Sequence, residues 1–190
     1  MNARQQAFLR QALSDWDMYS NLAGRRASIG GKTLAWLRRT LRLPAGPRDW
    51  QAKPVCHSLH YLQMATEKLA KAYFTTLPKK HLGLMKLLTA LSTNAKAVRH
   101  LGFASLADLD AWVTSAAAVG DAVEKLAPAL AGAGPNAEYP WPPGAELTAP
   151  VDHPFQVEFF TKLTAQAASG QPPFLEVVER MTATLGSWCQ

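Results

Sequence analysis

The feature that most constrains how this chain folds is a regular stripe of side chains in residues 54–73. The stripe positions recur every three or four residues and are Val55, Leu59, Leu62, Thr66, Leu69 and Tyr73. This spacing places them along one face of an α-helix and predicts that the face is buried. Pro54 opens the segment, and proline suits the first turn of a helix. We therefore predict a long core helix that begins at Pro54.

Other segments show the same period and predict an all-α fold. The predicted helices cover residues 3–22, 54–73, 81–91 with a weaker turn to 100, 105–126, 155–168 and 173–188. Ser105 and Asp108 form a capping-box pattern at the start of one of them, with Asp in place of the usual Glu. No segment has the pattern of a strand, and 190 residues suit one domain. The sequence thus predicts a single antiparallel bundle of five to six helices over residues 1–190.

Two segments interrupt this helical pattern. Residues 24–53 form a basic insert, with a short helix predicted over 32–43, and residues 132–154 form a loop that holds six prolines. Eight basic residues against Asp49 alone give the insert a formal charge of +7, which leaves −1 for the rest of a chain of net charge +6. A basic block can bind an acidic partner, but it can equally be a solvated surface. The candidate phosphate- or RNA-binding residues are Arg25, Arg26, Lys32, Arg38, Arg39 and Arg42.

Composition bounds the cellular setting of the chain. Charged residues interrupt every apolar run before the ~18 residues that span a bilayer. The first residues lack the apolar core of a secretory signal. Cys56 and Cys189 lie far apart without metal-ligand spacing, which favours inert, reduced thiols. We expect a cytoplasmic protein without a membrane partner.

One histidine pair raises the question of a metal site. His57 and His60 stand three apart on the predicted core helix, with Gln63 and Glu67 farther along roughly the same stripe. A di-metal centre in a helix bundle uses Glu-x-x-His pairs, and the sequence contains none. We therefore interpret the stripe as a polar or partner-facing surface and predict no metal and no cofactor.

Short motifs link these helices to a known family. The first helix contains Gln11-Ala12 followed by Asp15, and the core helix contains Gln63-Met64-Ala65-Thr66-Glu67-Lys68 followed by Lys71. His81-Leu82-Gly83-Leu84 opens the third helix, and Glu138-Tyr139-Pro140 follows later. Over residues 4–23 and 54–188 the chain resembles the HEPN family, the helical domains named for nucleotide binding in higher eukaryotes and prokaryotes. That family often has Arg-Tyr-Pro where this chain has Glu138.

The resemblance implies a polar core between the first two long helices. Its members here are Asp15, Gln63, Glu67, Lys68 and Lys71. We expect Asp15 to approach Lys68 or Lys71. Glu67 and Lys71 stand four apart in the favourable order for a helical ion pair, which adds about 0.2–0.5 kcal/mol.

The resemblance also sets the functional expectation. Many members of the family are ribonucleases with an Arg and a His separated by four to six residues, and no histidine here has such an Arg. Without that pair, His81 and His100 are only weak catalytic candidates. We predict a non-catalytic HEPN-like binding or partner module that contacts RNA or a nucleotide. The expected partners are a second copy of the chain and a nucleotidyltransferase-type protein. The alternatives are a toxin-like HEPN ribonuclease and a structural adaptor without a nucleic-acid role.

Overall fold

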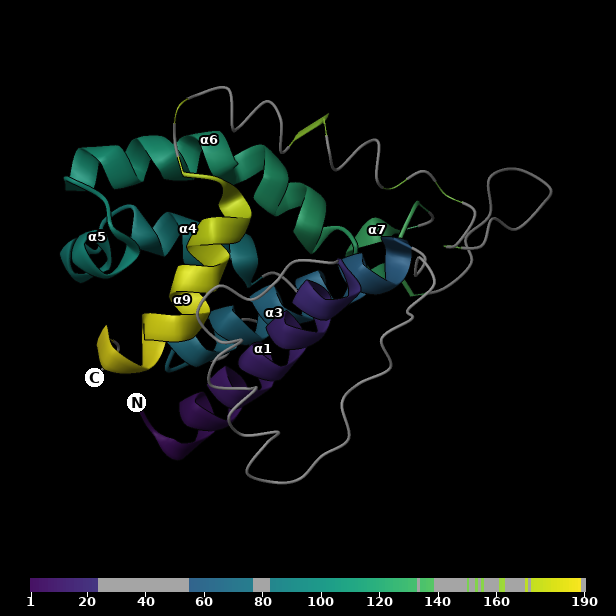
Figure 1. Ribbon diagram of the computed structural model, residues 1–190, viewed down its shortest axis with the longest axis horizontal. Coiled ribbons are helices and arrows are strands. Elements are labelled where there is room, and N and C mark those ends of the chain that lie inside the picture. Colours follow the sequence, from purple (N-terminus) through teal and green to yellow (C-terminus); the bar gives the residue numbers. More distant parts are fainter. Residues whose placement is uncertain are drawn as a thin grey trace.

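The computed structural model describes residues 1–23, 55–76, 83–132, 134–138 and 172–188, with isolated residues between 150 and 170 (Figure 1). Its helices are α1 (Ala3–Leu22), α3 (Val55–Tyr73), α4 (Leu84–Leu91), α5 (Ala95–Leu101), α6 (Leu106–Glu124), α7 (Pro128–Ala131) and α9 (Phe174–Trp188). No strand occurs among the described residues. The predicted all-α helix bundle is confirmed. The predicted basic helix over 32–43 and most of both interrupting segments lie outside the described residues.

Helices α1 and α3 form an antiparallel pair that is the longest contact of the bundle (Figure 1). Asn2 begins α1 through a reciprocal capping box with Gln5, in which each side chain bonds the other's backbone N–H. The face that α1 turns to α3 buries Ala12, Trp16 and Tyr19. The α3 stripe predicted from the sequence is buried as expected at Leu59, Leu62, Thr66 and Leu69.

Helix α6 lies on the far side of α4 and α9 from α1 in Figure 1, and α4 packs between α3 and α6. Trp112 of α6 is completely buried and stacks on Phe174, with ring centroids 6.4 Å apart. Its indole N–H donates to the Pro172 carbonyl at 2.6 Å, which satisfies the one polar atom of this core side chain. The first turn of α9 is thereby fixed against α6.

The third predicted helix begins later than the sequence suggested, at Leu84 rather than at residue 81. Its N-terminus is capped from α6, because the Glu124 carboxylate accepts the backbone N–H groups of Leu84 and Met85 at 2.9 and 3.3 Å. Burial raises the pKa of Glu124, and these two hydrogen bonds oppose the rise. The cap lies 40 residues away along the chain, so no local pattern reveals it.

The weaker turn predicted up to residue 100 is a separate helix, α5. Asn94 caps its start, and Gly102 ends it in the left-handed conformation with φ of 74°. Ser105 caps α6 as predicted by accepting the Asp108 N–H at 3.1 Å. The short Asp108 side chain, however, accepts the Ser105 hydroxyl at 2.7 Å instead of returning to a backbone N–H.

Helix α6 ends at Glu124, two residues short of the prediction, and Pro128 opens α7. Proline has no backbone N–H, and it fits there because a residue at the first helical position has no intrahelical acceptor for that group. In the described part of the chain, no helix is both long and apolar enough to cross a membrane.

Candidate functional site

The five polar residues implied by the family resemblance lie together where α1 faces α3, and we call them the polar seam. They are Asp15 on α1 and Gln63, Glu67, Lys68 and Lys71 on α3. Gln63, Glu67 and Lys71 stand four apart along α3 and adjoin on one side of the helix, and Lys68 stands three before Lys71. Asp15, Gln63 and Glu67 are buried, and the two lysines are partly buried.

Glu67 is the centre of the seam and is only 3% exposed. Its carboxylate accepts the Gln63 side-chain amide at 3.1 Å and forms ion pairs with Lys68 at 3.4 Å and with Lys71. Lys71 also lies 5.7 Å from the centre of the Phe8 ring, close enough for a cation–π contact. The stabilisation of about 0.2–0.5 kcal/mol expected for a helical ion pair applies to exposed side chains and therefore does not apply to Glu67 and Lys71, because the Glu67 carboxylate is buried. Losing one partner of a buried pair costs far more than losing a surface pair.

Asp15 completes the seam from α1 and is 6% exposed. Gln11 donates to its Oδ1 at 2.9 Å, whereas Oδ2 is buried without a hydrogen-bond partner among the described residues. Burial raises the pKa of Asp15, while the Gln11 hydrogen bond and the charges of Lys68 and His60 oppose the rise. The approach of Asp15 to Lys68 or Lys71 stays a prediction.

A contact that the sequence did not reveal joins the seam to the segment after α7. The His60 Nδ1 lies 3.5 Å from the Glu138 carboxylate, and both side chains are partly exposed. Glu138 stands where the sequence resemblance leads one to expect an arginine. Its side chain faces a histidine of α3. The two residues are too far apart in sequence for any periodicity to pair them.

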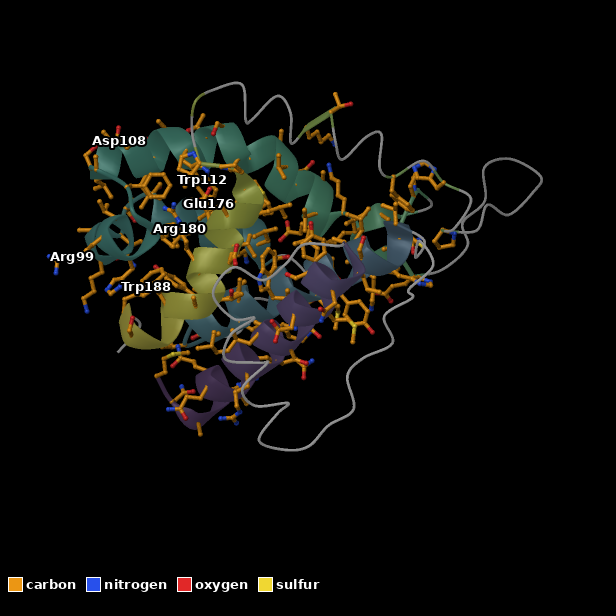
Figure 2. The ribbon with its side chains drawn as sticks, in the orientation of Figure 1. Arg99, Asp108, Trp112, Glu176, Arg180 and Trp188 are labelled. Carbon is orange, nitrogen blue, oxygen red and sulfur yellow. The ribbon has the colours of Figure 1, made fainter. Side chains whose placement is uncertain are left out.

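His100, one of the two weak catalytic candidates, lies on α5 against the C-terminal end of α9. Its ring stacks on Trp188 with centroids 5.9 Å apart and planes 12° from parallel. The neighbouring Arg99 is exposed and points outward, and Arg180 lies on α9 (Figure 2). The Arg180 guanidinium is held by the Leu101 carbonyl and by Glu176. Within the described residues, that arginine is therefore engaged in structural contacts and not directed at His100.

Several candidates from the sequence lie outside the described residues. They are His81 and the basic insert residues Arg25, Arg26, Lys32, Arg38, Arg39 and Arg42. His57 is exposed on α3, whereas His60 and Glu67 belong to the contacts above. No group of three metal-ligating side chains occurs in the described ranges. Cys56 is buried, and burial raises the pKa of its thiol, which disfavours the reactive thiolate.

No protein-family model, curated protein or solved structure matches this chain. The relation to the HEPN family therefore rests on the sequence motifs and stays a prediction.

Proposed function

We propose that this chain is a non-catalytic, HEPN-like helical module that binds RNA or a nucleotide through the cations of its basic insert. The observation that carries the proposal is the uneven distribution of charge between the insert and the rest of the chain. The insert has a formal charge of +7, and the rest of the chain sums to −1. Excess positive charge concentrated in one segment favours binding to phosphate.

The polar seam supports placing the phosphate contacts in the insert. Lys68 and Lys71 are only 15% and 19% exposed, and both pair with Glu67. A lysine held in this way is not available to neutralise an RNA phosphate. The seam therefore serves to join α1 to α3, and ligand phosphates must find their cations elsewhere.

The test is affinity for single-stranded RNA and for nucleotides at two salt concentrations. Reversing two insert charges with Arg38→Glu and Arg39→Glu should weaken binding and flatten its salt dependence, by a slope of about 1.4 for two phosphates on a single strand. The matched control is Lys86→Glu with Lys125→Glu, which changes the net charge equally on exposed positions of the bundle. Unchanged RNA affinity in the insert variant would refute the role of the insert.

A ribonuclease remains the second candidate because His100 is a positioned histidine with Arg99 beside it. Its activity would need a further basic group, supplied by another part of the chain or by a second copy. Metal-free cleavage of RNA that His100→Ala abolishes would support this function. Absence of cleavage across varied RNAs at high protein concentration would exclude it.

The proposed partners are a second copy of the chain and a nucleotidyltransferase-type protein, as the family resemblance implies. Sedimentation of the purified chain over a range of concentrations tests the homodimer directly. A species of about 41 kDa, twice the 20.7 kDa chain, is the expected result. A single monomeric species at all concentrations would remove the homodimer from the proposal.

A further inference from the structure

Helix α5 carries a second group of basic side chains, separate from the insert. Lys96, Arg99 and His100 stand at positions i, i+3 and i+4, so they adjoin on one side of the helix. Lys96 and Arg99 are exposed and His100 is half-buried. Neither of the two exposed cations forms a side-chain ion pair or hydrogen bond within the described residues. The helix itself contains no acidic residue.

The fold does not need these side chains to cap α5. Gly102 and Phe103 donate their backbone N–H groups to carbonyls of the last turn at 3.3 and 2.9 Å. Arg180 reaches across from α9 and donates to the final carbonyl of the helix. The usual structural reason for basic residues in a last turn is thus largely met by other groups. The exposed Arg99 side chain is therefore not needed to cap α5.

His100 rests on a ring whose position is fixed. Trp188 is buried, and its indole N–H donates to the Thr184 hydroxyl at 3.1 Å. The Tyr73 ring packs edge-on against the same indole, with centroids 6.1 Å apart. The nearly parallel stack therefore holds the His100 imidazole against a buried side chain, and His100 itself is half-buried. Figure 2 shows Arg99 extending from the same end of the molecule at which Trp188 lies.

We propose that this face of α5 binds single-stranded RNA, with Lys96 and Arg99 on phosphates and His100 stacked on a base. Cations beside a half-buried ring such as that of His100 suit sequence-tolerant binding of single strands, because every base offers a π-face. The inference rests on the proposed function and adds a defined surface, on the described bundle, for the same class of ligand. An acidic protein surface would use the cations but would gain nothing from the supported ring.

Charge reversal tests the phosphate contacts. Lys96→Glu with Arg99→Glu should weaken binding to a fluorescent oligouridine at least about tenfold at low salt and lower the salt slope by about 1.4. The control is again Lys86→Glu with Lys125→Glu, at the start of α4 and just after α6. Because both double variants change the net charge equally, the long-range field alone cannot produce a difference between them. Equal losses in the two would overturn the assignment to α5.

Removal of the bases tests the stacking contact. An oligonucleotide with abasic sugars keeps its phosphates, so the wild-type protein should bind it about tenfold more weakly than oligouridine. His100→Ala should abolish that preference while leaving affinity for the abasic strand unchanged. His100→Phe should restore the preference, since the phenyl ring can occupy the same stack. A preference that survives His100→Ala in a folded protein would refute the stacking role.

The same measurements separate this inference from the proposed function. If the insert variant loses RNA and the α5 variant behaves like its control, the α5 surface is refuted and the proposed function stands. If only the α5 variant loses affinity for RNA, RNA binding by the α5 surface is supported and RNA binding by the insert is refuted. If the wild-type protein binds no oligonucleotide at low salt, both proposals fail.

Discussion

The polar seam between α1 and α3 and the basic face of α5 both contain lysine side chains, yet they differ in burial and in charge balance. In the seam, Glu67 is 3% exposed and is paired with two lysines. On α5, Lys96 and Arg99 are exposed and have no acidic partner within the described residues. Basic side chains therefore pair with a buried carboxylate in the seam, whereas they face water on α5.

This difference separates structural charge from charge that can bind a ligand. A lysine that already pairs with a buried carboxylate would have to leave that carboxylate uncompensated in order to contact RNA, at a cost of several kcal/mol. A solvated lysine releases only water and counterions when it meets a phosphate. The family-like motif of α3 thus corresponds to the region least suited to binding, and the unremarked α5 to the better one.

The largest effect expected from this comparison is the loss of protein stability when the seam loses Glu67. Glu67→Ala removes the acceptor of Lys68, Lys71 and Gln63 together, so the free energy of unfolding should fall by about 3–5 kcal/mol. Urea denaturation followed by circular dichroism measures the change. Glu67→Gln should lose less, because its amide oxygen still accepts one hydrogen bond.

The matched control for Glu67 is the exposed pair of the same i,i+4 type on α6. Asp121 and Lys125 are 48% and 63% exposed and lie 2.8 Å apart. Asp121→Ala should therefore change the free energy of unfolding by only about 0–1 kcal/mol. If Glu67→Ala were equally mild, burial would not distinguish the seam from an ordinary surface pair, and the comparison would be broken.

A smaller, pH-dependent effect is expected at Asp15. Burial raises its pKa above the ordinary value of 3.8, so the folded protein holds the proton more tightly than the unfolded chain does. The free energy of unfolding therefore falls as the pH rises from that ordinary value through the raised one. Asp15→Asn has no carboxyl to titrate and does not lose this stability. The free energy of unfolding of the variant should therefore rise relative to that of the wild-type protein as the pH passes from the ordinary pKa through the raised one. Urea titrations between about pH 3 and 7 measure it, and a constant difference would contradict the assignment.

Local periodicity predicted the helices because each buries one face. The α3 stripe, the bounds of α1 and the burial of Trp16 and Trp112 all follow from three-to-four spacing against an apolar core. Errors arose where a distant group sets a boundary. Leu84 begins α4 because Glu124 of another helix caps it. The capping box of Asn2 and Gln5, in contrast, is a local pattern of the sequence.

The candidate site was less predictable than the fold. The motif on α3 indicates that Gln63, Glu67, Lys68 and Lys71 belong together, but the burial of Glu67 depends on how closely α1 lies on α3, which no spacing specifies. His60 and Glu138 meet only because the segment after α7 returns to α3. Trp188 was expected as a helix end, whereas its role as support for His100 depends on the packing of α9 against α5.

The smallest effect on the free energy of unfolding is expected on the basic face of α5. Lys96→Glu with Arg99→Glu should leave the free energy of unfolding within about 0.5 kcal/mol of wild type, since both side chains are exposed surface positions. The two changes also oppose each other, because a glutamate is favourable near the N-terminus of α5 and unfavourable near its C-terminus. Urea denaturation of the same protein sample used for RNA binding measures this directly. A near-native stability combined with lost RNA affinity would assign these cations to binding. A loss comparable to that of Glu67→Ala would instead place them in the structural framework, and the contrast between the two regions would disappear.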